Sequence, residues 1–139
     1  MLIFLNNLIL LDLTLDGLPP TVNHIYKSHG KLRYKSHEAK LYQKLVCDSM
    51  RNAWNNKEPF NRHLELYITF QTNDHVRWDI DNRVKALQDC LNIAGVIKDD
   101  SLINLLHVER TYGNSKSTNI ILKESQHELR RTMPLRFLS

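Results

Sequence analysis

The chain has 139 residues, of which 42% are hydrophobic and 24% charged, as is typical of one globular domain with a buried core. Lysine and arginine outnumber aspartate and glutamate by 19 to 15, so the net charge of +4 is compatible with a nucleic-acid partner without establishing one. The only two cysteines, Cys47 and Cys90, exclude a disulfide framework, and a cytoplasmic location is therefore expected.

The first predicted element is a strand over residues 8–16, in which Leu11, Leu13 and Leu15 alternate with polar side chains. The apolar residues before it are interrupted by asparagines and lack a basic n-region. They are interpreted as the lead-in to this strand, not as a signal peptide or a membrane span. A Gly-Leu-Pro-Pro run ends the strand, because proline cannot donate to a sheet ladder.

A helix of about twenty residues is predicted after Ser36, which is suited to cap its N-terminus. Before it, residues 21–35 are expected to form a polar loop with a short hairpin around Gly30. Asn55 and Pro59 mark the end of the helix. Its apolar residues recur at helical spacing: Ala39, Tyr42, Leu45, Val46, Met50 and Ala53.

Strand and helix patterns alternate in the second half of the chain. Residues 63–71 alternate apolar and polar side chains and predict a half-buried strand. A helix with one apolar stripe is predicted over residues 82–94, with Gly95 at the left-handed position after its end. Two further strands are expected at 102–110 and 117–123. The order β-α-β-α-β-β predicts an α/β (α+β) domain with a mixed sheet.

The stretch WDIDNRVK gathers acids within a basic chain. Asp79 and Asp81 point the same way if this segment is extended, because side chains on a strand repeat every two residues. Lys85 lies about one turn into the predicted helix, and Asp89 lies four residues further on, where it can pair with Lys85. Acids and a lysine are thus expected to share one side of the start of the helix.

A second acidic pair, Asp99 and Asp100, follows the helix. If this segment returns beside the start of the helix, three carboxylates converge, and their repulsion opposes folding unless a cation lies among them. Mg²⁺ binds carboxylates and phosphate and activates water, while a nearby lysine can neutralise developing charge. The alternative is purely local, with a helix cap, a solvated ion pair and a turn.

Two stretches resemble the motifs of a known family. The longer one runs Asp79-x-Asp81-Asn82-x-x-Lys85-x-x-x-Asp89, then Gly95, then Asp99-Asp100. The shorter one, Leu-Pro-Pro-Thr-Val-Asn, ends at Asn23 and follows the first predicted strand. In this order they resemble the RusA-type Holliday junction resolvases, crossover junction endodeoxyribonucleases that are common in phages and prophages. The resemblance covers about residues 10–124 of a single domain, 1–139.

The resemblance implies a homodimeric endonuclease that depends on Mg²⁺, with Mn²⁺ as a substitute, and resolves four-way DNA junctions by paired nicks in recombination and repair. Asp79, Asp81 and Asp100 match its catalytic, metal-binding aspartates, and Lys85 matches its essential lysine. Four further positions are expected to support the site: Asn82, interpreted as a helix cap, Asp89, interpreted as the orienter of Lys85, Asp99 and Asn23.

Basic residues flank the acidic motif and are expected to contact DNA. Residues 24–37 interleave cations with tyrosines, and basic groups bind phosphates while aromatic rings stack on bases. A solvated loop is the alternative for this segment. The predicted DNA contacts are Lys27, Lys31, Arg33, Lys35, Arg77 and Arg83.

Other chemistries have little support. His24, His29 and His37 match no common zinc spacing, and Cys90 lies beside the buried stripe of the second helix, where a packed thiol is expected. No phosphate-binding loop or nucleophile elbow occurs in the sequence, so neither a nucleotide cofactor nor a serine triad is expected.

Two alternative functions stay open. The protein could bind branched DNA without cutting it, or it could be a nuclease that acts on flaps, forks or RNA. The presence of every matched acid and of the lysine argues against a decayed site. The tail, 125–139, lies outside the resemblance and is expected to begin as a short polar helix and to end in an apolar run that docks on the core or on a second subunit.

Overall fold

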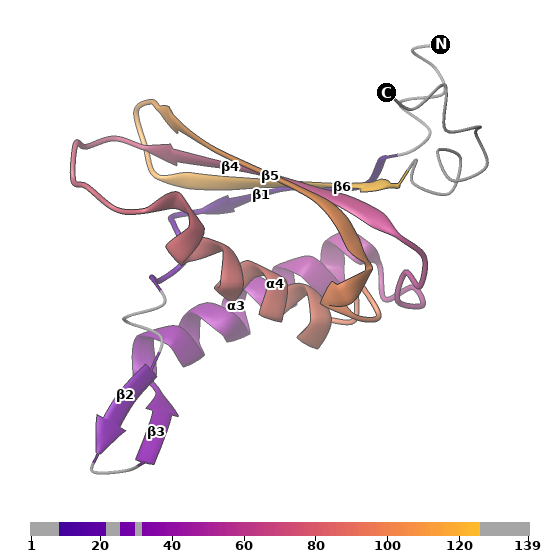
Figure 1. The fold of residues 1–139 in the computed structure, drawn as a ribbon, viewed down its shortest axis with the longest axis horizontal. Coiled ribbons are helices and arrows are strands. Elements are labelled where there is room, and N and C mark those ends of the chain that lie inside the picture. The colour runs from indigo at the N-terminus through magenta and orange to yellow at the C-terminus, as the bar shows by residue number, and fades with distance from the viewer. Residues whose placement is uncertain (1–8, 22–25, 30–31, 126–139) are drawn as a thin grey trace, which may run out of the picture.

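The computed structural model describes residues 9–21, 26–29 and 32–125, and for 26–29 and 32–35 it describes the backbone alone. A four-stranded sheet lies against two α-helices, so the described chain forms two layers (Figure 1). This arrangement confirms the predicted α+β class with a mixed sheet. The hairpin expected around Gly30 lies between the first strand and the first helix and adds two short strands to the predicted order.

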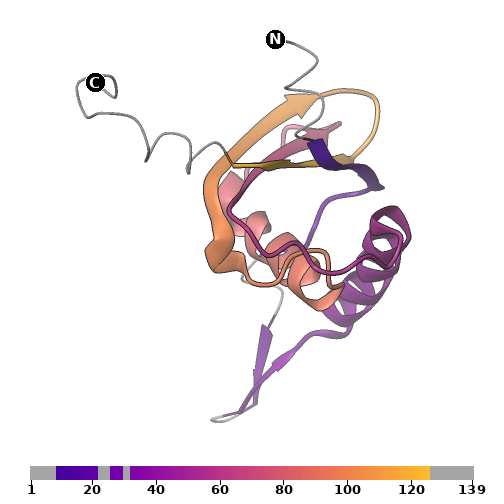
Figure 2. The ribbon, with the colours of Figure 1, turned by 90° about the vertical axis from the view of Figure 1, so that its right-hand side faces the viewer.

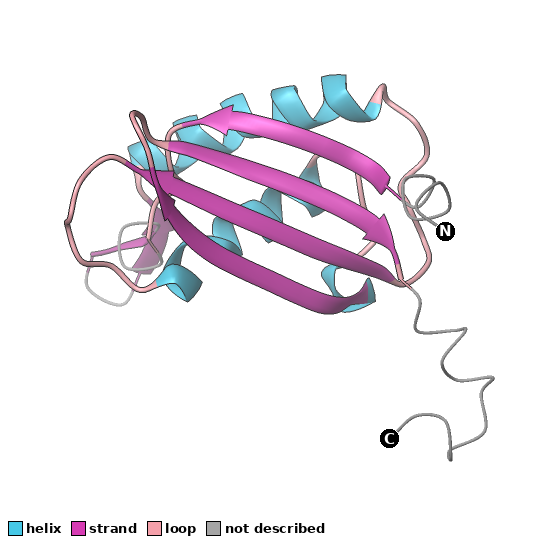
Figure 3. Cartoon of the chain, turned by 90° about the horizontal axis from the view of Figure 1, so that it is seen from above, coloured by secondary structure: helices cyan, strands magenta, loops and turns pink. Residues whose placement is uncertain are grey.

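The main sheet has the strand order β1-β6-β4-β5 (Figure 3). Its strands are β1 (Ile9–Asp16), β4 (Leu64–Thr72), β5 (Ile103–Tyr112) and β6 (Ser117–Glu124). β6 is antiparallel to both β1 and β4, whereas β4 and β5 are parallel. A parallel pair needs a crossover connection, and the segment that contains the second helix supplies it. β5 is therefore an edge strand of the described sheet.

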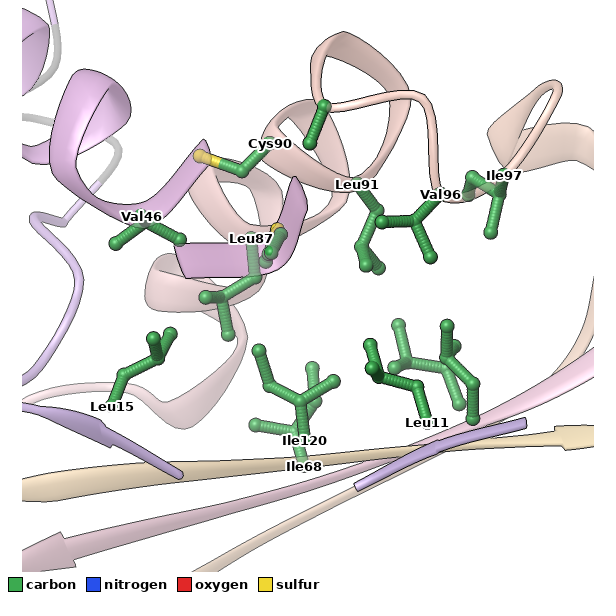
Figure 4. Close-up of a cluster of buried hydrophobic side chains, with 14 of the residues drawn as sticks. Leu11, Leu15, Val46, Ile68, Leu87, Cys90, Leu91, Val96, Ile97 and Ile120 are labelled. Carbon is green, nitrogen blue, oxygen red and sulfur yellow. The ribbon is translucent and has the colours of Figure 1, made fainter. Parts of the chain in front are cut away.

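The core lies between the sheet and the helices. Alternation along β4 turns Leu64, Leu66, Ile68 and Phe70 inward, and all four are fully buried. In Figure 4 side chains from the strands point toward side chains from the helices, which include Leu87. The β4 residues between these four buried side chains face the opposite side of the sheet, because successive side chains on a strand alternate between its two faces.

Helix α3 (His37–Trp54) begins and ends where the sequence predicts. The Ser36 hydroxyl accepts a hydrogen bond from the Ala39 backbone N–H at 3.2 Å, which satisfies one of the free donors at the helix start. At the other end Asn55 adopts a left-handed conformation, with φ of 62°. Local capping chemistry therefore fixes both boundaries.

The predicted apolar stripe of α3 is only partly correct. Leu45 is 59% exposed, and Ala53 is also exposed. Cys47 and Trp54 occupy the buried face instead, and the Cys47 thiol donates to the Cys90 carbonyl oxygen at 3.7 Å. The inner face of α3 is set by its contact with both the sheet and the second helix, and periodicity alone does not reveal that direction.

The second helix starts differently from the prediction. A 3₁₀ turn, η1 (Ile80–Arg83), leads into α4 (Val84–Ile93). Asn82 lies within η1, and the residue at the N-cap of α4 is Arg83, which makes no side-chain capping bond, so the interpretation of Asn82 as the cap is wrong. Gly95, with φ of 76°, confirms the left-handed position. The predicted stripe of Val84, Leu87, Leu91 and Ala94 is buried, together with Ala86 and Cys90.

A short hairpin, β2 (Tyr26–His29) and β3 (Leu32–Lys35), confirms the one expected around Gly30. It extends away from the main body near the start of α3 (Figure 2). The expectations for the apolar lead-in before residue 9 and for the tail after residue 125 lie outside the described residues.

Candidate active site

Asp79 and Asp81 lie where the chain returns from the sheet to the start of α4. Asp79 has an extended backbone, and its carbonyl oxygen accepts a hydrogen bond from the Asn82 N–H at 3.2 Å. Asp81 follows in the first turn of η1. Both aspartates are exposed, so their carboxylates are accessible from solvent.

Trp78 anchors the backbone immediately before Asp79. The guanidinium groups of Arg83 and Arg110 lie 4.5 and 4.2 Å from the centre of its ring, and Phe70 meets the ring edge-on. Arg110 also donates a hydrogen bond to the Trp78 carbonyl oxygen. These contacts tie the residue that precedes the first acid to the core and to β5.

Arg83 makes a second connection, because it donates a hydrogen bond to the Pro19 carbonyl oxygen. This bond joins the Pro-Pro turn after β1 to the acidic segment, so the two motifs that are far apart in the sequence meet in the fold. Burial lowers the pKa of Arg83, and the charge of Arg110 lowers it further. Its guanidinium is committed to internal contacts, and this does not fit the predicted DNA contact.

Lys85 and Asp81 share a groove between α4 and β5. The groove has a volume of about 420 Å³, and apolar side chains such as Val84 and Leu106 line much of it. The Lys85 ammonium lies 3.4 Å from an Asp89 carboxylate oxygen, so the predicted pair is formed. The side chain of Lys85 is 53% exposed, which leaves its charge accessible.

Asp100 lies at the opposite end of α4 from Asp79 and Asp81. It opens a second 3₁₀ turn, η2 (Asp100–Leu102), directly before Ile103, which pairs with the first residue of β4. Trp78, by contrast, is bonded to Arg110 near the far end of β5. Figures 1 and 3 show η1 and η2 at opposite ends of the helix. From Ile103 to Arg110, β5 spans about 20 Å.

The expectation that three carboxylates converge is therefore wrong for a single copy of the chain. Within the described residues, no group of three or more histidine, cysteine, aspartate or glutamate side chains could hold a metal ion. The physical reason is the length of α4, whose ten residues carry the chain about 15 Å along the sheet before it turns into β5. Asp81 lines one groove with Lys85, and Asp79 lies two residues before Asp81, whereas Asp100 lies at the other end of α4.

Asp99 stabilises its own turn. Its carboxylate accepts hydrogen bonds from the Ser101 backbone N–H, at 3.4 Å, and from the Ser101 hydroxyl. The Ser101 hydroxyl lowers the pKa of Asp99. This geometry supports a local role for Asp99 beside the exposed Asp100.

Of the predicted DNA contacts, Arg77 is exposed two residues before Asp79. The backbones of Lys27, Arg33 and Lys35 lie on the β2–β3 hairpin. Lys31 and the supporting residue Asn23 lie outside the described residues. In Figures 1 and 3 the hairpin and the loop that leads to η1 lie at the same end of the molecule.

Sequence reasoning missed Arg110. The residue is the last one of the strand predicted over 102–110, and a single arginine there gives no periodic signal. Its contact with Trp78 joins residues 32 positions apart. Only the parallel pairing of β4 with β5 brings them together.

The fold and the exposed acids define a small α+β protein with two solvent-accessible aspartates at the start of α4. The chain belongs to the RusA endodeoxyribonuclease family, because the model of that family, Endodeoxyribonuclease RusA, matches residues 16–123. Membership implies an endodeoxyribonuclease that acts on Holliday junctions. No individual curated protein matches the sequence significantly. Within the described part of the chain, no helix is both long enough and apolar enough to cross a membrane.

Proposed function

We propose that the chain is a Mg²⁺-dependent endonuclease that resolves four-way DNA junctions by paired nicks as a homodimer. The observation that carries this proposal is the exposed pair Asp79 and Asp81 at the start of α4, with Lys85 in the groove that Asp81 also lines. Family membership supports the reaction class, and these three side chains are the groups we assign to the chemistry.

The donor set of the acidic segment fits Mg²⁺. Asp79 and Asp81 offer exposed carboxylate oxygens, and Mg²⁺ is commonly held by one or two carboxylates together with water and phosphate oxygens. When bound, Mg²⁺ would lower the pKa of the attacking water and stabilise charge on the scissile phosphate. Mn²⁺ accepts the same oxygen donors and is expected to substitute for it.

Lys85 would stabilise the negative charge that develops on the phosphate during attack. Its contact with Asp89 restricts a long, flexible side chain, so less ordering is needed when DNA arrives. Arg110 and Trp78 would hold the backbone of Asp79 in position during the reaction. Asp89 would thus position the lysine, while Arg110 and Trp78 would position the first acid.

A homodimer would account for the position of Asp100. β5 is an edge strand of the described sheet, and Leu106 beside the groove is 47% exposed. If two β5 edges paired antiparallel about a two-fold axis, the start of one strand would lie beside the end of the other. Asp100, which precedes β5, would then approach Asp79 and Asp81 of the second copy.

The first experiment measures cleavage of a synthetic four-way junction with and without Mg²⁺, in parallel with Asp79→Asn. We expect paired nicks from the parent protein and a rate lower by about a hundredfold or more from the variant. Fork, flap, linear duplex and RNA substrates of matched length complete the series. An uncut junction would contradict the proposal, as would undiminished cutting by Asp79→Asn. Faster turnover of forks or RNA would identify one of these as the preferred substrate and would leave the proposed chemistry unchanged.

A subunit-mixing experiment tests the shared site. Asp79→Asn and Asp100→Asn are each expected to be inactive alone, but a mixed dimer would contain one intact site and would recover single-strand nicking. A mixture of Asp79→Asn with Asp81→Asn is the control, because both variants damage the same half of the site and no intact site can form. Recovery in neither mixture would contradict a site built from two chains.

A further inference from the structure

Three exposed side chains form a surface beside the acidic segment that the proposed chemistry does not use. His75 and Val76 come from the loop after β4, and Tyr112 ends β5; we call them the aromatic ledge. The rings of His75 and Tyr112 have centroids 5.6 Å apart and are inclined by 35°. Tyr112 is 61% exposed and Val76 is 66% exposed. Large apolar groups are thus gathered on the surface instead of scattered singly.

The aromatic ledge rests on a fixed support. The Asp74 carboxylate accepts hydrogen bonds from the Val76 backbone N–H at 3.1 Å and from the Thr72 hydroxyl at 3.4 Å. The same carboxylate forms an ion pair with Lys116, at 3.1 Å, in the turn between β5 and β6. The loop and the turn are therefore tied together beneath the exposed rings, which reduces the ordering needed to bind a flat ligand.

The aromatic ledge lies close to the acids. Arg110, which bonds to the Trp78 carbonyl oxygen, lies two residues before Tyr112, and the two share one face of β5. Two residues of a strand span about 7 Å, which is roughly two base steps along one strand of DNA. A nucleotide strand held at Asp79 could therefore reach the ledge within a few nucleotides.

The surroundings indicate the chemistry of the ligand. Arg77 is exposed next to Val76, and Lys116 lies beneath the loop, so cations flank the rings. Cations suit phosphates, whereas an exposed ring pair suits the face of a base. In a continuous duplex those faces are covered by neighbouring base pairs, and they become available where stacking is interrupted.

We propose that the aromatic ledge stacks against an unstacked base at the branch point of the DNA, a few nucleotides from the scissile phosphate. This proposal rests on the proposed function, because it takes branched DNA as the substrate. The ledge would contribute to the preference for a junction over a duplex, since stacking is interrupted inside the junction at its branch point and is continuous inside the duplex. Tyr112 and His75 would be the stacking residues, and Asp74 would position the loop.

The test measures DNA binding without cleavage, with EDTA present. A four-way junction carries 2-aminopurine, a fluorescent base, at the branch point, and a linear duplex of equal length is the reference. Tyr112→Ala and His75→Ala are expected to weaken junction binding about tenfold and duplex binding less than twofold. Both should also remove the change in 2-aminopurine fluorescence that the parent causes. Tyr112→Phe keeps the ring and should bind like the parent.

The control uses a second histidine–tyrosine pair on the same sheet. Tyr67 and His107 are neighbours on β4 and β5, with ring centroids 5.8 Å apart, and they lie in the middle of the sheet, away from η1. Tyr67→Ala, on the inner strand β4, should change neither binding nor fluorescence. Equal losses on junction and duplex would overturn the ledge proposal, and so would unchanged fluorescence or a change of oligomeric state in Tyr112→Ala.

The outcomes separate the two proposals. A parent protein that cuts junctions, and whose ledge variants bind like the parent, would refute the ledge and leave the proposed function intact. A parent protein that shows no preference for junctions would refute both. Because binding is measured without divalent metal, failure of the proposed metal chemistry alone would leave the ledge result unchanged.

Discussion

Replacing Arg110 with methionine tests whether the support of Trp78 positions Asp79, the first of the two acids to which we assign the chemistry. The arginine contacts the ring of Trp78 at 4.2 Å and donates a hydrogen bond to its carbonyl oxygen. Methionine retains much of the apolar volume against the ring and removes both the charge and the donor. The perturbation is therefore directed at the backbone one residue before Asp79.

The magnitude follows from the two lost interactions. A hydrogen bond from a charged group contributes about 1.5–3 kcal/mol, and a cation over an aromatic ring contributes about 1 kcal/mol. Arg83 lies against the same ring, so removal of Arg110 also relieves the repulsion between two like charges. This relief offsets part of the lost stabilisation. We expect the free energy of unfolding of Arg110→Met to fall by about 2 kcal/mol.

The effect on cleavage should be larger than the effect on stability suggests. A displacement of about 1 Å in a catalytic group can lower a rate by two orders of magnitude. We expect Arg110→Met to reduce the nicking rate on a four-way junction by 10- to 100-fold, and to raise the Mg²⁺ concentration needed for half-maximal rate. Junction affinity measured in EDTA should stay close to that of the parent. Urea unfolding supplies the stability measurement.

Lys123→Met is the control, because Lys123 also lies over an aromatic ring, that of Tyr67, at 4.9 Å. Lys123 pairs with Glu65 near the start of β4, at the end of the sheet away from Trp78, and we expect a loss of less than about 1 kcal/mol and no change in Mg²⁺ dependence there. If Arg110→Met lost stability as expected but kept the parent's rate and Mg²⁺ dependence, Arg110 would be a stabilising residue, and a positioning role for it would be refuted.

Three further predictions concern single interactions. Asp89→Asn removes the partner of Lys85 from an exposed pair, so the free energy of unfolding should change by less than about 0.5 kcal/mol while the nicking rate falls; an unchanged rate would show that Asp89 does not orient the lysine. Tyr42→Phe removes a buried hydroxyl with no hydrogen-bond partner among the described residues, and burial raises the pKa of this phenol. Urea unfolding should therefore show a gain of about 1 kcal/mol, and a loss would mean that the hydroxyl is paired. The hydrogen bond from Lys116 lowers the pKa of Asp74, so the support of the loop should be complete above about pH 4 and be lost as the pH falls through the lowered value. The Val76 amide resonance should report this titration, and Lys116→Met should move its midpoint upward.

Much of the fold could be predicted because the deciding interactions are local. The alternation along β4, the capping hydroxyl of Ser36 and the left-handed Gly95 each depend on residues within one turn or one strand. Leu45 could not be placed correctly, because it has the spacing of the stripe but lies outside the face that meets the sheet. That face is decided by how α3 contacts the rest of the molecule.

In the candidate site, too, the local contacts could be predicted from the sequence and the long-range contacts could not. The pairing of Lys85 with Asp89 follows from helical spacing and was predicted. The contact of Arg110 with Trp78 depends on the pairing of distant strands, and it was not predicted. The convergence of Asp100 with the other acids was expected from the order of motifs, but their separation in space depends on where the chain leaves α4. Sequence order alone does not give that direction.

The separation of the acids has an electrostatic consequence. Asp79 and Asp81 are exposed, and the described chain brings no third carboxylate to them, so a single copy avoids the repulsion that a triple cluster would cause. If a second copy supplies Asp100, the third carboxylate arrives only on dimerisation, when Mg²⁺ can neutralise it. Such a protein would be inactive as a monomer, and its dimer would carry two equivalent sites related by a two-fold axis. A four-way junction offers two equivalent strands to such a pair, whereas a linear duplex offers no branch point at which both sites can act together.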